Sequence, residues 1–102
     1  MVRKIVWAKE ASFERNEILA YWNHRNKSNL YSKKLLLLFK GALNSIKLSP
    51  EVGKPTNRQD TKLRIVRDYF IVYRIKPDTI RILSVWDMRQ NPTKLDEIIK
   101  HR

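Results

Sequence analysis

The segment ILSVWDMRQNP, residues 82–92, ends a strand-like pattern with three side chains that can bind charged or polar groups. Asp87, Arg89 and Gln90 follow an alternation of apolar residues typical of a half-buried strand. A carboxylate, a guanidinium and an amide in four residues can bind a partner, or can form contacts that fix the chain locally. We therefore treat this strand end as a candidate binding site.

Two arginines of the preceding strands form a second candidate site. If Pro77-Asp78 is a two-residue turn, Arg74 lies directly opposite Arg81. Like charges in this position repel unless an anion or a carboxylate sits between them. Asp87 or a phosphate from outside would supply that charge. A surface charge network of these residues without any ligand is the alternative interpretation.

The composition limits the chemistry that these residues can perform. The 102 residues fit one domain, 1–102, and carry 22 Lys and Arg against 10 Asp and Glu, a net charge of +12. This charge favours a polyanion or an acidic protein as partner. No cysteine is present and the two histidines, His24 and His101, lie far apart, so we expect neither a metal nor another cofactor. The longest apolar run, LLLLF, is too short to cross a membrane, and no signal peptide is visible, so we expect a soluble cytoplasmic protein.

Apolar periodicity and turn residues predict the elements that position these side chains. A helix of about ten residues is only marginally stable in isolation, so the predicted helix at the end of the chain must dock on the domain or on a partner. The order β-α-α-β-β-β-α predicts an α+β fold in which a helical hairpin packs on an antiparallel sheet. The predicted elements are a strand at 3–8, helices at 9–26 and 28–49, a loop at 51–61, three strands within 62–87 and a helix that begins at Asn91-Pro92.

The alternation along the last two strands predicts two different sheet faces. The face that the helices cover should carry Tyr69, Ile71, Tyr73, Ile75, Ile80, Ile82, Ser84 and Trp86. The other face should carry Phe70, Val72, Arg74, Arg81, Leu83, Val85 and Asp87. Because this second face is half apolar and half cationic, it suits an amphipathic protein segment or a nucleic-acid backbone.

The turn at Arg67-Asp68 decides where Arg64 lies. A two-residue turn places Arg64 on the helix-covered face, whereas a three-residue turn places it beside Arg74. We predict the three-residue turn, because an unpaired buried arginine costs more free energy than a slightly longer turn.

The chain resembles a known toxin family in the hairpin LRIVRDYFIVYRI, residues 63–75, and in DTIRILSVWDMRQNP, residues 78–92. These segments are similar to the ParE branch of the RelE/ParE superfamily, the toxins of bacterial type II toxin-antitoxin modules. A first strand that ends in Trp7, two helices and LSPEVGKP at 48–55 fit the same pattern, so the resemblance covers essentially the whole chain. It implies a RelE/ParE-like fold and a toxin that inhibits growth by binding an essential target, DNA gyrase.

The RelE branch of the same superfamily implies a different activity. Its members are ribosome-dependent ribonucleases that cut messenger RNA without a metal, using cations and an acid-base group near the phosphate. Phe70 stands where those enzymes carry an arginine, and Thr56 stands where YoeB relatives carry a glutamate. This resemblance implies as catalytic residues Lys62, Arg64, Arg89 and His101. A nucleic-acid-binding domain without toxicity is the third alternative, which only the charge supports.

In the binding interpretation, the strand end meets the target and the sheet face meets the antitoxin. Trp86, Asp87, Arg89 and Gln90 would form a rim beside the last helix, unless Asp87 and Arg89 only pin that helix to the sheet. An acidic antitoxin segment, disordered when free, would relieve the repulsion between Arg74 and Arg81. The apolar side chains expected beneath it are Phe70, Val72, Leu83 and Val85. The oligomeric state is left open.

Overall fold

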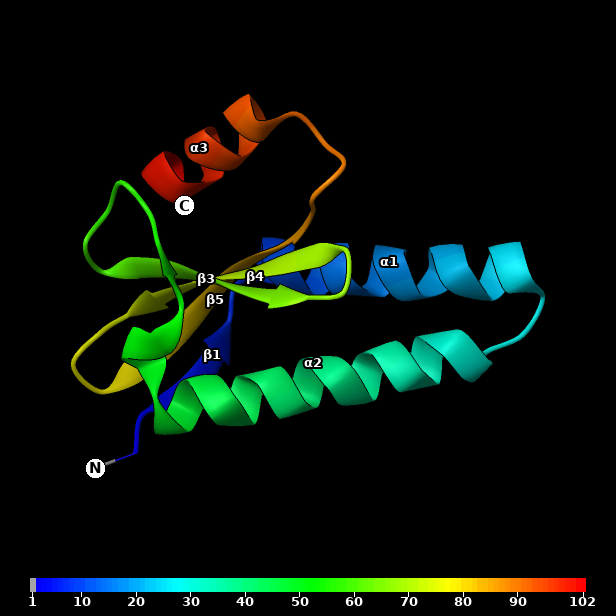
Figure 1. Ribbon diagram of the computed structural model, residues 1–102, viewed down its shortest axis with the longest axis horizontal. Helices are drawn as coiled ribbons and strands as arrows, with labels where there is room; N and C mark the ends of the chain where they lie inside the picture. Colours follow the sequence, from blue (N-terminus) through cyan, green and yellow to red (C-terminus); the bar gives the residue numbers. More distant parts are fainter. Residues whose placement is uncertain (1) are drawn as a thin grey trace.

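A computed structural model describes residues 2–102 as one mixed sheet between two helical layers (Figure 1). The strand order in the sheet is β1-β5-β4-β3-β2. The α+β prediction, with a helical hairpin on one face of the sheet, is confirmed. The elements are β1 (Lys4–Trp7), α1 (Lys9–Asn26), α2 (Leu30–Leu48), the 3-10 helix η1 (Pro50–Val52), β2 (Lys54–Pro55), β3 (Thr61–Val66), β4 (Tyr69–Ile75), β5 (Thr79–Asp87) and α3 (Pro92–His101).

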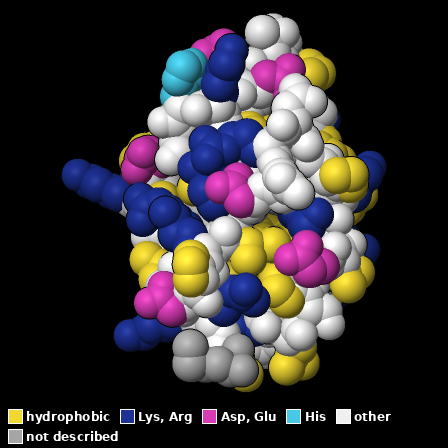
Figure 2. Space-filling view, turned by 90° about the vertical axis from the view of Figure 1, so that its left-hand side faces the viewer, with side chains coloured by type: hydrophobic (Ala, Val, Ile, Leu, Met, Phe, Trp, Pro, Cys, Tyr) yellow, Lys and Arg dark blue, Asp and Glu magenta, His cyan; other side chains and the backbone are white. Residues whose placement is uncertain are grey.

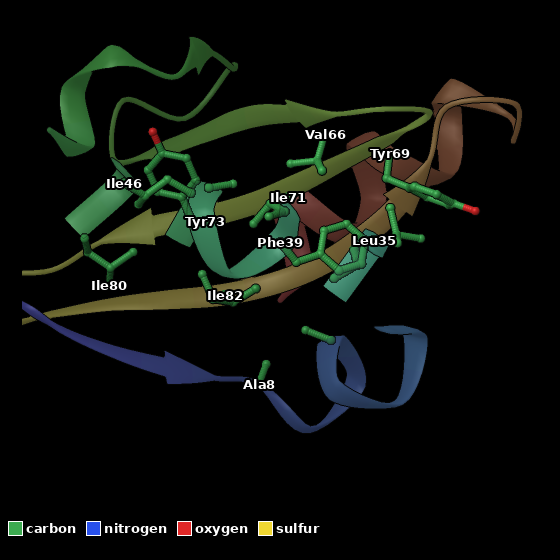
Figure 3. Close-up of a cluster of buried hydrophobic side chains, with 13 residues drawn as sticks. Ala8, Leu35, Phe39, Ile46, Val66, Tyr69, Ile71, Tyr73, Ile80 and Ile82 are labelled. Carbon is green, nitrogen blue, oxygen red and sulfur yellow. The ribbon is translucent and has the colours of Figure 1, made fainter. Parts of the chain in front are cut away.

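The helical hairpin of α1 and α2 covers one sheet face, here called the hairpin face. Apolar residues at three- and four-residue spacing form the buried stripe of α2, as the sequence predicts, and Ala11 of α1 is fully buried. Lys27 ends α1 in a left-handed conformation with φ 50°, and the Ser28 hydroxyl accepts a hydrogen bond from Leu30 N. Figure 3 shows the resulting core, whose labelled side chains include Leu35, Phe39, Ile46, Ile71, Ile80 and Ile82.

Two features of the sheet differ from the purely antiparallel prediction. β1 pairs with β5 in parallel, with Lys4 opposite Thr79. Parallel pairing is possible because the long connection between these two strands, which includes the helical hairpin, lets both run in the same direction. β2 lies inside the predicted 51–61 loop and pairs Lys54 with Leu63. A strand of two residues has no periodicity, so the sequence contains no signal for it.

A bulge in β5 changes which residues share a face. The predicted register is confirmed where Arg74 lies opposite Arg81, but beyond Tyr73 it shifts by one, so that Val72 lies opposite Ser84 and not Leu83. One extra residue sends every later side chain to the other face. The predictions for Val85, Trp86 and Asp87 are therefore wrong. Val85 packs in the core of the hairpin face, and Trp86 packs against Val72 on the opposite face. Asp87 lies opposite Tyr69, on the side of the hairpin face.

The third helix covers this opposite face, here called the α3 face (Figure 1). Asn91 caps α3, as predicted, because its side-chain oxygen accepts a hydrogen bond from Thr93 N at 3.0 Å. The helix docks on its own sheet, and this face is not the open surface that the sequence pattern indicated. Leu95 and Ile99 of α3 pack with Val72, Leu83 and Trp86, and Phe70 is partly buried beside them.

Gly53 is predicted to be essential for the close packing of Tyr73. The Tyr73 hydroxyl donates a hydrogen bond to Pro50 O at 2.7 Å, and burial raises the pKa of this hydroxyl. A Cβ at residue 53 would overlap the hydroxyl oxygen, so Gly53→Ala should lower the free energy of unfolding by about 1–3 kcal/mol. The control is Gly41→Ala in α2, where a Cβ meets open space and a gain of about 0.5–1 kcal/mol is expected. Urea denaturation measures both, and equal midpoints for the two variants would contradict the prediction.

Candidate functional site

The ribonuclease candidates Lys62, Arg64 and Arg89 and the arginine pair Arg74 and Arg81 lie in three different places. Lys62 and Arg64 alternate with Leu63, which packs on the α3 face, so both belong to the hairpin face. Lys62 lies 3.9 Å from Glu51. Arg74 and Arg81 belong to the opposite face, and Arg89 follows the far end of β5. The structure therefore does not bring these side chains to one region.

The turn at Arg67-Asp68 explains the position of Arg64. The turn has two residues, with Val66 opposite Tyr69 and Arg64 opposite Ile71, so the predicted three-residue turn is wrong. The expected burial cost does not arise because β3 lies near the sheet edge, where the Arg64 side chain stays partly exposed. Arg67 adopts φ 57°, a backbone conformation that residues other than glycine rarely use.

Arg74 is buried and hydrogen-bonded, and it is not a free cation. Its Nε donates to Thr61 Oγ1 at 2.9 Å and its Nη2 donates to Ile99 O at 2.8 Å. Burial lowers the pKa of Arg74, and the neighbouring charges of Arg58 and Arg81 lower it further. The carboxylate beside Arg74 comes from Asp60, at 3.6 Å, and not from Asp87 as expected. Arg74 thus ties the last turn of α3 to the sheet.

His101 does not meet the other ribonuclease candidates either. It lies in the last turn of α3 with an exposed side chain, and its Nε2 is 3.1 Å from Glu97 of the same helix. Within residues 2–102, no three His, Asp or Glu side chains are grouped as metal ligands would be. No described helix is both long and apolar enough to pass through a bilayer.

A cleft of about 440 Å³ separates α1 from the end of β5, and we call it the α1–β5 cleft. The β5 side contributes most of the predicted rim. Trp86 reaches the cleft only in part, because only 5% of its surface is exposed and its ring packs beneath α3. The cleft is lined by Phe13, Glu17 and Tyr21 of α1 on one side and, among others, by Tyr69, Asp87, Arg89 and Gln90 on the other.

Glu14 fixes the distance between α1 and β5 at the floor of this cleft. Its Oε1 accepts hydrogen bonds from Ser84 Oγ at 2.9 Å and from Val85 N at 3.3 Å. Arg102 donates to the same carboxylate at 3.1 Å and to Leu83 O at 3.0 Å. One acidic side chain therefore joins α1, β5 and the residue after α3, which makes the cleft wall rigid.

Asp87 and Arg89 form a closed ion pair at the cleft mouth. Arg89 donates two parallel side-chain hydrogen bonds to the carboxylate of Asp87, at 3.0 and 2.8 Å, and its backbone N–H donates a third at 2.9 Å. The hydrogen bond from Arg89 lowers the pKa of Asp87, and the same contact raises the pKa of Arg89. Neither residue bonds to α3 in the described structure, so the pair shapes the cleft and does not pin the helix.

The ion pair should persist in acid. Because the folded pKa of Asp87 lies below the ordinary value of 3.8, the pair is complete above that value and is lost as the pH falls through the folded pKa. Arg89→Gln removes the side-chain donors, so the pKa of Asp87 should rise towards 3.8. Titration of the Asp87 carboxyl by NMR measures this shift, with Arg81→Gln as the control. An unchanged pKa in Arg89→Gln would show that another group holds the carboxylate.

The cleft residues on α1 are not among those that the sequence pattern singled out. Phe13, Glu17 and Tyr21 recur every four residues, so they share one helix face that is offset from the buried stripe. Phe13 is 65% exposed and Tyr21 is 48% exposed. The sequence did contain a signal for this part of the cleft: Phe13 and Tyr21 repeat at helical spacing but lie outside the predicted buried stripe. The Tyr69 hydroxyl borders this face and accepts a hydrogen bond from Trp22 Nε1 at 2.8 Å.

Comparisons with known proteins match this architecture. The fold is similar to that of a chain from the chromosomal ParDE TA system of P. aeruginosa, with a TM-score of 0.73, 12% identity, and coverage of 86% of this chain and 98% of that one. It is also similar to the YoeB dimer from Staphylococcus aureus, with a TM-score of 0.58, 17% identity, and coverage of 84% and 97%. These likenesses establish a RelE/ParE-like fold. No curated protein matches the chain.

A family model extends the assignment beyond the fold. The model of the ParE toxin of the type II toxin-antitoxin system, parDE, matches residues 5–92, which include the α1–β5 cleft and both candidate strand sites. The match ends at the first residue of α3. The chain belongs to the ParE toxin family of type II toxin-antitoxin systems.

Proposed function

We propose that this ParE-family toxin inhibits growth in the cytoplasm by binding DNA gyrase through the α1–β5 cleft. The observation that carries the proposal is the composition of the cleft: two exposed aromatic rings, Phe13 and Tyr21, stand beside an arginine whose charge is already paired. Exposed aromatic residues and arginines supply most of the binding energy at protein interfaces. A rigid cleft wall adds to affinity because little conformational freedom is lost on binding.

The geometry supports binding better than RNA cleavage. Cleavage without a metal needs several cations and an acid-base group around one phosphate. Here the β3 cations, the buried Arg74 and the paired Arg89 are directed to separate surfaces, and His101 lies on α3. The fold likeness to a YoeB chain is compatible with either activity, since one fold can support different functions.

The antitoxin of this module is proposed to be an acidic protein. The net charge of +12 would steer such a partner to the toxin and make its association rate sensitive to salt. Figure 2 shows one end of the molecule, where basic side chains outnumber acidic ones and lie among hydrophobic patches. The sheet surface expected from the sequence to receive the antitoxin is covered by α3, and we propose that the antitoxin uses another surface.

Purified gyrase tests the proposed target. Supercoiling of a relaxed plasmid should stop when the toxin is added in excess over gyrase, and should resume when an acidic protein encoded beside the toxin is added as well. Unchanged supercoiling at high excess would exclude gyrase as the target. Primer extension on messenger RNA from induced cells separates the alternative, because new 5′ ends within translated codons would indicate a ribonuclease.

A further inference from the structure

The outer edge of β3 is unpaired beside an apolar groove. β2 pairs only with Lys62 and Leu63, so the described structure provides no strand partner for the last three residues of β3. The two-residue turn makes Val66 and Tyr69 a hydrogen-bonded pair, and this pairing alternates along the ladder. The N–H and C=O of Ile65 are therefore directed away from β4, towards the open edge.

A groove of about 390 Å³ runs along this edge, between β3 and α2, and we call it the β3-edge groove. Leu37, Leu38 and Gly41 of α2 line one side, and Arg64, Ile65 and Arg67 line the other. Leu37 is 68% exposed and Ile65 is 48% exposed. Gly41 widens the groove, because a Cβ built on it would have no neighbour within 4 Å.

The charges of the groove select its occupant. Both of its charged lining residues, Arg64 and Arg67, are basic, and the described residues add no acidic side chain to the lining. Arg67 has a left-handed φ of 57°, as a two-residue hairpin turn requires at its first position, so the turn places this residue beside the groove. A second copy of this chain, with its own net charge of +12, would bring the same two arginines to this edge, which disfavours self-association here.

We propose that the β3 edge is extended by one strand from an acidic protein segment, which lays aliphatic side chains in the β3-edge groove and directs carboxylates to Arg64 and Arg67. Addition of a strand gives affinity through main-chain hydrogen bonds and specificity through alternate side chains. The β5 edge is closed to such addition, since Glu14 accepts from Val85 N and Arg102 donates to Leu83 O. Identifying the antitoxin as the source of this segment rests on the proposed function, whereas the proposal that the β3 edge binds an acidic strand does not depend on it.

Ile65→Pro tests the main-chain contact. Proline removes the N–H that is directed to the open edge, and an edge strand tolerates proline at a position that is not bonded to its neighbour. The matched control is Ile65→Thr, which keeps the N–H and the branched Cβ. Urea denaturation checks that both variants are folded, and both should unfold cooperatively.

The probe is a synthetic eight-residue peptide that alternates valine and aspartate, observed by NMR on the full chain. The amide signals of Ile65, Arg67 and Gly41 should shift, and hydrogen exchange at Ile65 should slow. Ile65→Pro should weaken binding about tenfold, the loss expected for one hydrogen bond, whereas Ile65→Thr should change it much less. The double variant Arg64→Glu with Arg67→Glu should lose binding at least as strongly.

Three outcomes of the peptide experiment would overturn the proposal. They are absence of binding to the wild-type chain, equal binding of a peptide that alternates valine and lysine, and shifts confined to another surface. Dimerisation of the wild type that Ile65→Pro abolishes would also overturn it, in favour of a second copy. Because gyrase inhibition should survive Ile65→Pro, failure of the peptide experiment and failure of the proposed function are separate results.

Discussion

Arg74→Glu is expected to lower the free energy of unfolding by about 4 kcal/mol, because it places a carboxylate in a buried site built for a cation. Only 7% of the Arg74 surface is exposed, and its guanidinium is bonded to Thr61 Oγ1 and to Ile99 O. Glutamate would lose both hydrogen bonds and would face the carboxylate of Asp60 and the carbonyl at the end of α3. The measurement is the urea midpoint, with the slope checked for two-state unfolding.

Arg81→Glu is the matched control for this substitution. Arg81 lies directly opposite Arg74 but is partly exposed, so reversing its charge should change the stability by no more than about 0.5 kcal/mol. Arg74→Met, which keeps the apolar stem, should cost about 2 kcal/mol through the two lost hydrogen bonds. If both charge reversals unfolded at the same urea concentration, Arg74 would not hold α3 in the way the structure indicates.

Replacing both exposed aromatic residues of the α1–β5 cleft should weaken gyrase inhibition by at least about 100-fold. Phe13→Ser combined with Tyr21→Ser removes the two rings that a partner would bury, while the Glu14 contacts that hold the cleft wall remain. Neither side chain belongs to the buried core, since Phe13 is 65% and Tyr21 48% exposed, so the fold should be preserved. The measurement is the toxin concentration that halves the supercoiling rate.

The control for the cleft variant is Leu48→Ser with Val52→Ser. These residues are 77% and 70% exposed, but they belong to the end of α2 and to η1, outside the cleft. Removing them deletes a similar amount of exposed apolar surface and should leave inhibition unchanged. If the cleft variant inhibited gyrase as strongly as the wild type, or if the cleft and control variants lost inhibition equally, the target would contact another surface.

The helices and most strand pairings follow from the sequence because local forces determine them. The apolar stripe of α2 around Leu35 and Phe39, the Asn91 cap and the two-residue turn at Pro77-Asp78 depend on residues close together in the chain. The net charge, the absence of cysteine and the hairpin motifs likewise point to the toxin family. These features need no long-range contact to be recognised.

The site depends on contacts between distant residues, which the sequence pattern does not contain. The β5 bulge exchanges Val85 and Trp86 between the faces, and a single inserted residue leaves the alternation of apolar residues nearly unchanged. Arg74 was expected to be an exposed cation that binds a partner. Docking of α3 buries it instead, and its side chain donates a hydrogen bond to Ile99 O, 25 residues away in the sequence. The sequence by itself determined the three α-helices, the four longer strands and the sign of the charge. The tertiary structure decided which cations remain exposed, because burial depends on what packs over a residue and not on the residues beside it.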